Sequence, residues 1–199
     1  MNARPVLSVV VGGLLALLAL AGCGRSPQTS FYTLTPLVAD ATIPKSTGPS
    51  ITIASVTLPE LVDRPQLVVP DGATRIAILE SQRWAEPLKS AIPRLLAENI
   101  SRLMNSDRVS AYPQHAAINA DYRLFVDLQR FELSGSTVVV DALWDIRSAK
   151  GAKSLTGRSK AVEPISSTDY EAVVAGYSRA IATLSKEITQ SLRNLQTKE

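Results

Sequence analysis

The chain has one cysteine and one histidine among 199 residues, which limits the chemistry that it could perform. Cys23 stands close to the N-terminus, so the rest of the chain has no thiol for a disulfide, a thiolate metal site or a cysteine nucleophile. His115 lies two residues after Pro113 and directly after Gln114, a context typical of a surface loop with a solvated side chain. We therefore expect the folded part to be stabilised by packing alone.

Recognisable catalytic motifs are also missing. There is no glycine-rich phosphate loop and no Gly-x-Ser-x-Gly elbow, and no Ser-x-x-Lys stands where a nucleophile would need it. Carboxylate pairs such as Glu60 with Asp63, or Asp141 with Asp145, are ordinary at this charge density. We therefore expect no enzymatic activity, no metal ion and no dissociable cofactor.

Neither sign of charge dominates. The chain carries 21 Lys and Arg against 18 Asp and Glu, and no run of five or six like charges. The pI of about 9.1 reflects only this small excess of basic residues. We therefore expect no nucleic-acid partner.

The N-terminal residues have the layout of an export signal. Arg4 gives a short positive segment, and residues 6–21 form an uncharged, mainly aliphatic run that ends just before Cys23. About 16 residues at a rise of 1.5 Å span about 24 Å, which is less than the ~30 Å hydrocarbon core of a bilayer. A cleaved signal peptide is therefore favoured over a retained transmembrane anchor.

Cys23 is the predicted lipidation site. Leu20, Ala21 and Gly22 before it resemble the lipobox of bacterial lipoproteins, in which the thiol receives a diacylglycerol and the new N-terminus is acylated after cleavage. Several acyl chains matter because a single chain binds a membrane only marginally. An Asp directly after the lipidated cysteine resembles an inner-membrane retention signal, but this chain has Gly24 at that position. We therefore expect attachment to the periplasmic face of the outer membrane rather than to the inner membrane.

The chain divides into three predicted parts. Residues 1–22 are the lipoprotein signal peptide, and residues 23–50 are the lipidated cysteine and a short tether with a brief N-terminal strand. Three prolines between positions 35 and 50 favour loop structure there. Residues 51–199 are long enough for one periplasmic α/β domain with an ordinary core.

Hydrophobic periodicity predicts a mixed α/β (α+β) fold: a mixed, mostly antiparallel sheet with two long helices packed on one face. Strands are expected at 51–56, 66–69, 75–79, 108–112, 122–133, 138–146 and 154–162, and helices at 88–104 and 170–195. The apolar phase slips near Gln129 and Arg130, which predicts a β-bulge. Pro93 predicts a kink or a later helix start, and Thr168 with Glu171 fits a capping box.

Two segments stand out as candidate partner-binding sites, LPELVDRPQLV at residues 58–68 and RWAEPL at residues 83–88. An ion pair of Asp63 with Arg64 could fix a turn, or the segment could be a recognition loop. Trp84 could be a core residue or an interface anchor. The candidate partner-binding residues are Leu58, Pro59, Asp63, Arg64, Pro65, Gln66, Arg83 and Trp84.

Together with the lipobox and FYTL at residues 31–34, these segments resemble the PqiC/YmbA-type lipoproteins, which are auxiliary components of ABC transport systems. The resemblance runs over nearly all of the chain after Cys23. It implies a partner of an MCE-type system that moves phospholipid or other hydrophobic molecules between the inner and outer membranes. The implied partners are an MCE-domain periplasmic protein and its inner-membrane permease and ATPase.

Three hypotheses follow for the function. The first is an accessory docking subunit of such a transporter, which supports envelope integrity. The second is a regulatory lipoprotein that binds and activates a periplasmic or cell-wall enzyme, although such regulators need a longer tether. The third is a carrier of a hydrophobic ligand, which needs an apolar pocket inside the domain. Homo-oligomerisation and the transported molecule stay open.

Substitution Cys23→Ala tests the anchor. It should abolish lipidation and membrane retention and leave the domain folded, because Cys23 precedes the predicted domain. Membrane fractionation and circular dichroism measure the two effects. A variant that still sediments with the outer membrane contradicts the predicted anchor.

Overall fold

The computed structural model describes residues 28–36, 48–113, 119–149, 151 and 154–197. Leu20, Ala21, Gly22, Cys23 and His115 lie outside these residues. The elements in chain order are β1 (Ser30–Tyr32), β2 (Ile51–Thr57), β3 (Gln66–Pro70), β4 (Ile76–Trp84), α2 (Leu88–Met104), β5 (Val109–Ala111), β6 (Tyr122–Ser134), β7 (Thr137–Ser148), β8 (Ser154–Pro164) and α3 (Tyr170–Thr197).

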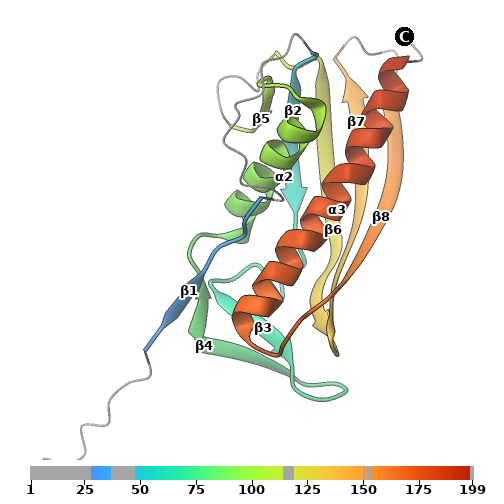
Figure 1. Ribbon diagram of the computed structural model, residues 1–199. Coiled ribbons are helices and arrows are strands. Elements are labelled where there is room, and N and C mark those ends of the chain that lie inside the picture. The colour runs from blue at the N-terminus through green and yellow to red at the C-terminus, as the bar shows by residue number, and fades with distance from the viewer. Residues whose placement is uncertain (1–27, 37–47, 114–118, 150, 152–153, 198–199) are drawn as a thin grey trace, which may run out of the picture.

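A five-stranded sheet in the order β5-β2-β6-β7-β8 forms the larger layer. Strand β2 is parallel to both β5 and β6, whereas β6, β7 and β8 form an antiparallel meander with long pairings. Helices α2 and α3 cover one face of this sheet (Figure 1). The predicted mixed α/β fold with two helices on one face is confirmed, and β8 is an edge strand.

The bulge predicted in the meander is also confirmed. The register between β6 and β7 shifts between Leu128 and Arg130, so one extra residue separates the two halves of β6. Before the shift Leu124 and Val126 face the helices, and after it Phe131 does so. The bulge therefore keeps both halves of β6 turned toward the core.

A second sheet in the order β1-β4-β3 lies beyond one end of the helices (Figure 1). Strand β1 runs parallel to the last three residues of β4, with Ser30 opposite Gln82, and β3 pairs antiparallel with β4. The sequence did not separate these strands from the larger sheet. After β1, buried Leu34 joins the core, and the N–H of Thr35 donates to Oγ of Ser178 in α3 at 3.1 Å.

Three aromatic side chains join the two sheets and α3, and we call them the aromatic junction. Trp84 ends β4, Phe131 follows the bulge in β6, and Tyr177 lies on α3. The Phe131 and Tyr177 rings stack with centroids 4.1 Å apart, and Trp84 lies 6.3 and 6.1 Å from them. All three are buried, and burial raises the pKa of the Tyr177 phenol.

Helix α2 begins at Leu88 and contains Pro93. The helix therefore does not start later than the apolar pattern indicates. Proline at the sixth helical position removes one hydrogen bond, to the carbonyl of Lys89 on the exposed side of α2. The ring of Pro93 is itself buried in the core.

The N-terminus of α3 differs by one residue from the predicted capping box. The N–H of Val173 donates to the carbonyl of Asp169 at 3.1 Å, which makes Asp169 the N-cap residue instead of Thr168. Asp169 also accepts a hydrogen bond from Oγ of Ser167. Thr and Asp are both common N-cap residues, so the sequence pattern located the start of the helix but did not distinguish Thr168 from Asp169 as its N-cap.

Gly157 in β8 allows Trp144 to lie flat across it. A Cβ on residue 157 would stand 2.1 Å from the indole, whose Nε1 donates to Oγ of Ser159 at 3.0 Å. Gly157→Ala should therefore displace Trp144 and lower the free energy of unfolding by about 1–3 kcal/mol. Urea unfolding measures this loss. Thr156→Ala is the matched control on the same strand, and equal stabilities of the two variants contradict the close packing.

Candidate functional site

The three-stranded sheet brings together the three segments that stand out in the sequence. Residues 31–34 enter through β1, residues 58–68 lead into β3, and residues 83–88 follow from the end of β4. The N–H of Trp84 donates to the carbonyl of Pro65 at 2.7 Å, and the N–H of Ala85 donates to that of Tyr32 at 2.8 Å. The segment at residues 83–88 is thus hydrogen-bonded both to the segment at residues 58–68 and to the segment at residues 31–34, about 50 positions earlier in the chain.

Side chains reinforce this arrangement. Nε2 of Gln66 donates to a carboxylate oxygen of Glu80 at 3.0 Å, and Arg83 pairs with the same oxygen at 3.3 Å. The hydrogen bond from Gln66 is the largest of the effects that hold the pKa of Glu80 below its ordinary value. Gln66 therefore has an evident structural role, since it ties β3 to Glu80 of β4, and Arg83 holds the same carboxylate from within β4.

The charged pair in the first segment is arranged differently from the local ion pair considered above. Asp63 lies 2.5 Å from Nζ of Lys89 on α2, and this contact links the loop to the first turn of the helix. The loop itself turns through the N–H of Val62, which donates to the carbonyl of Pro59 at 3.0 Å. Leu58 packs against the core, whereas Pro65 is exposed.

Trp84 is a core residue, the first of the two interpretations left open by the sequence. Its side chain is 7% exposed and belongs to the aromatic junction. A side chain this deeply buried packs inside the fold and does not contact a partner directly.

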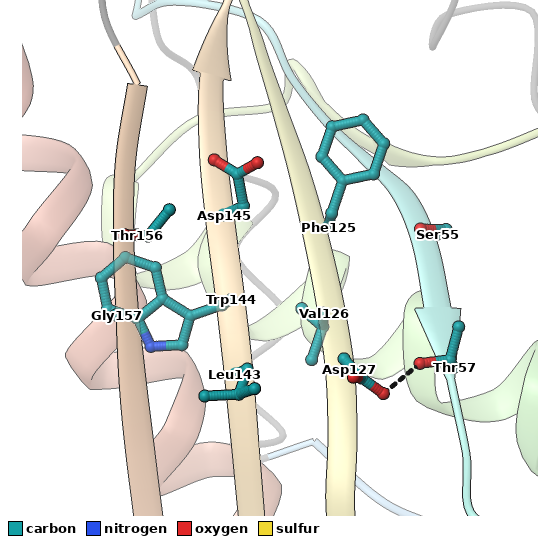
Figure 2. Close-up of a pocket in the computed structure, with 10 residues that line it drawn as sticks. All are labelled: Ser55, Thr57, Phe125, Val126, Asp127, Leu143, Trp144, Asp145, Thr156 and Gly157. Atoms are coloured by element: carbon teal, nitrogen blue, oxygen red, sulfur yellow. Dashed lines mark hydrogen bonds between the residues drawn. The ribbon is translucent and has the colours of Figure 1, made fainter.

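A groove of about 590 Å³ lies on the face of the larger sheet that the helices leave uncovered (Figure 2). Leu143 is 43% exposed there, and Phe125 lies beside it on β6. The Arg147 guanidinium lies 4.5 Å from the centre of the Phe125 ring, within cation–π range. The residues that line the groove are Ser55, Thr57, Phe125, Val126, Asp127, Leu143, Trp144, Asp145, Thr156 and Gly157.

The sequence contained one indication of this groove. Phe125 stands between Arg123 and Asp127, on the polar side of the alternating pattern of β6. An aromatic residue at an outward position indicates an apolar patch on the open face. Seven of the other lining residues come from three more strands, β2, β7 and β8, so only the assembled sheet reveals the groove.

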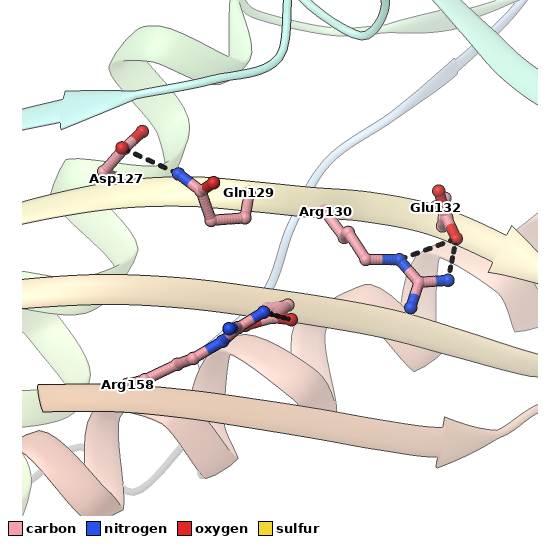
Figure 3. Close-up of polar contacts among 6 residues, drawn as sticks. Asp127, Gln129, Arg130, Glu132 and Arg158 are labelled. Atoms are coloured by element: carbon pink, nitrogen blue, oxygen red, sulfur yellow. Dashed lines mark hydrogen bonds and ion pairs between the residues drawn. The ribbon is translucent and has the colours of Figure 1, made fainter.

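Several polar and charged side chains on this face contact one another (Figure 3). Gln129 donates to Asp127 at 2.7 Å, Arg130 pairs with Glu132, and Arg158 holds Asp141 through two hydrogen bonds of 2.8 and 2.7 Å. The described residues contain no group of three or more His, Cys, Asp or Glu side chains placed to hold a metal ion.

An enclosed cavity lies between β3 and the aromatic junction, and it is very small. Its volume is about 10 Å³, enough for about one water molecule. An acyl chain does not fit there, so this cavity gives no support to the hypothesis of a carrier with an internal pocket.

Comparison with known proteins identifies the family. Residues 32–189 match the family model described as ABC-type transport auxiliary lipoprotein component. The chain belongs to this family. Among the described residues no helix has the length and apolar character to cross a membrane, and membership of a lipoprotein family associates this auxiliary lipoprotein with the cell envelope.

Solved structures share the fold of this auxiliary lipoprotein. Protein XCC0632 from Xanthomonas campestris is 18% identical and gives a TM-score of 0.68, with 85% of this chain and 98% of that chain covered. An uncharacterized protein of known crystal structure is 17% identical and gives 0.67, with 83% and 99% covered. Among curated proteins none matches the sequence significantly.

Asp141 should make the free energy of unfolding of the protein depend on pH in the acidic range. Its side chain is 3% exposed, and the hydrogen bonds from Arg158 hold its pKa below the ordinary value despite burial. A carboxylate with a lowered pKa in the folded state stabilises the fold above the unfolded-state pKa of about 3.9, and this contribution is lost as the pH falls further.

Asp141→Asn should therefore lower the free energy of unfolding by about 1–2 kcal/mol at neutral pH, since the exposed Arg158 can be rehydrated. The difference from the wild type should shrink below about pH 4, where the wild type loses the same contribution. Thermal unfolding between acidic and neutral pH measures it. Glu132→Gln, in a more exposed pair on the same face, is the control. A pH-independent difference contradicts the role of the charge.

Proposed function

We propose that this protein is a non-catalytic, lipid-anchored accessory subunit of an ABC/MCE-type transport system. In that role it sits on the periplasmic face of the outer membrane and supports the movement of phospholipid or other hydrophobic molecules between the two membranes. The observation that carries the proposal is the family match over residues 32–189. The lipobox residues Leu20, Ala21 and Gly22 before Cys23 agree with it.

A non-catalytic role is supported by the chemistry of the open face. The groove is lined mainly by apolar and hydroxyl side chains, and the carboxylates at its rim contact neighbours. Asp127 accepts hydrogen bonds from Thr57 and Gln129, and Asp145 accepts one from Arg147 at 2.6 Å. These contacts give both carboxylates a structural role on the open face, which suits a binding surface.

We propose that the loop at residues 58–65 contacts the MCE-domain partner. Glu60, Leu61 and Pro65 are exposed, while the loop is held by Leu58 in the core and by the contacts of Asp63 and Pro65 with α2 and β4. A loop that is already ordered loses little conformational entropy on binding. The exposed residues Glu60 and Leu61 are thus held in an ordered loop before a partner binds.

The length of the tether counts against the regulatory alternative. Strand β1 is hydrogen-bonded to β4, so the chain joins the folded body at Ser30 and not at residue 50. The seven Cα–Cα steps from Cys23 to Ser30 span at most about 25 Å. A body held so close to one membrane is better placed to receive a partner that crosses the periplasm than to reach across it.

The experiment is crosslinking of the tagged, lipidated protein in native envelopes, followed by mass spectrometry of the captured proteins. An MCE-domain protein among them is the expected result. Asp63→Ala with Arg64→Ala should reduce that capture severalfold, and the loss of the ion pair between half-buried Asp63 and exposed Lys89 should cost about 1 kcal/mol of stability.

Lys89→Ala is the matched control because it removes the same ion pair from the helix side without replacing a residue of the loop, which Leu58 and Pro65 still hold. The proposal expects capture to persist in this variant. Loss of capture in both variants, or a loss of thermal stability with normal capture, means that the pair is structural. Capture of a cell-wall enzyme without an MCE-domain protein favours the regulatory alternative.

A further inference from the structure

The three-stranded sheet exposes large apolar side chains that the core does not use. Phe31 on β1 is 66% exposed, and Ile76 and Ile78 on β4 are 47% and 39% exposed. Only four other large apolar side chains among the described residues are as accessible, and they lie in a loop, after β5, and on β7 and β8. The smaller sheet therefore carries three of the seven exposed large apolar side chains among the described residues.

Ile76 and Ile78 share one face of β4. The residues between and after them, Ala77 and Leu79, are half-buried, which is the alternation of a strand with one covered face. Across the ladder, Ile76 stands opposite Pro70 and Ile78 opposite Val68. The outer side of this sheet is thus apolar on both β3 and β4.

The position of the tether indicates what covers these residues. Ser30 begins β1, next to Phe31, and at most about 25 Å of chain separates it from Cys23. Figure 1 shows β1, β3 and β4 together at one end of the molecule and the C-terminus at the other. A lipid on Cys23 therefore holds the three-stranded sheet nearer the bilayer than the far end of the larger sheet.

We propose that Phe31, Ile76 and Ile78 form a second, apolar contact with the lipid surface to which the chain is anchored. This inference rests on the lipid anchor of the proposed function. The contact can be weak by itself, because the tether keeps the local concentration of bilayer high. Its effect is to fix the orientation of the body and to leave the uncovered face of the larger sheet free of the membrane.

The charge of this region specifies the kind of contact. Three arginines, at positions 64, 75 and 83, face five carboxylates between residues 58 and 86, and residues 28–36 carry no charge. Attraction to anionic lipid is not expected from such a balance. The contact should depend on buried apolar surface, and salt should leave it intact.

The test uses the mature, lipidated chain in vesicles of phosphatidylethanolamine and phosphatidylglycerol. Cys23 is the only cysteine and is blocked by the lipid, so Ile78→Cys provides one free thiol for an environment-sensitive fluorophore. The expected result is a blue-shifted emission that nitroxide-labelled lipids quench strongly. Quenching should persist at about 1 M salt, where the Debye length is about 3 Å.

Tyr112→Cys, labelled in the same way, is the matched control. Tyr112 is exposed, follows β5 and lies in the larger-sheet half of the fold, so its probe should be quenched little. Phe31→Ser with Ile76→Ser, added to the Ile78 probe, should abolish most of the quenching while circular dichroism stays unchanged.

The outcomes separate this inference from the proposed function. If Cys23 carries acyl groups but the Ile78 probe is not quenched, the membrane contact alone is overturned. Phe31, Ile76 and Ile78 would then be available to a protein partner. Equal quenching of the Ile78 and Tyr112 probes, or quenching that salt removes, also overturns the membrane contact. A Cys23 without acyl groups contradicts the anchor and this inference together.

Discussion

The packing of Trp84, Phe131 and Tyr177 connects the two sheets to each other and to α3. Each side chain comes from a different unit: the three-stranded sheet, the larger sheet and the long C-terminal helix. Phe131 reaches the other two only because the bulge before it restores the inward phase of β6. Leu67 on β3 and Leu34 after β1 are buried in the same core, so the junction and these two leucines together attach the three-stranded sheet. Its short strand ladders alone would give little stability.

This junction explains why the distinctive sequence segments lie where they do. Pro65 accepts from the backbone of Trp84, Gln66 and Arg83 share Glu80, and Tyr32 accepts from Ala85. Most of these residues hold strands together or fill the core. Contact with other molecules is therefore more plausible at the exposed positions between them, such as Leu61 in the loop and Ile78 on β4.

Local patterns predicted most of the larger sheet and both helices. The apolar alternation along β6 and its slip at Gln129 and Arg130 are local features, because both depend only on residues that are adjacent in the sequence. The pairing of β1 with β4 joins residues about 50 positions apart, and nothing in either segment indicates its partner. The same limit applies to Asp63, whose partner Lys89 lies on another element, and to the groove around Phe125, which four strands assemble.

The two sheets divide the surface in a way that suits an anchored subunit. The larger sheet buries one face under the helices and presents on the other a groove whose two carboxylates already have partners: Asp145 pairs with Arg147, and Asp127 accepts hydrogen bonds from Thr57 and Gln129. The smaller sheet receives the tether and exposes aliphatic side chains with little favourable charge. If the smaller sheet meets lipid, the orientation of the body is fixed by two points instead of one. The loop at residues 58–65 and the open face of the larger sheet are then both held at a constant height above the membrane, where the proposed partner would meet them.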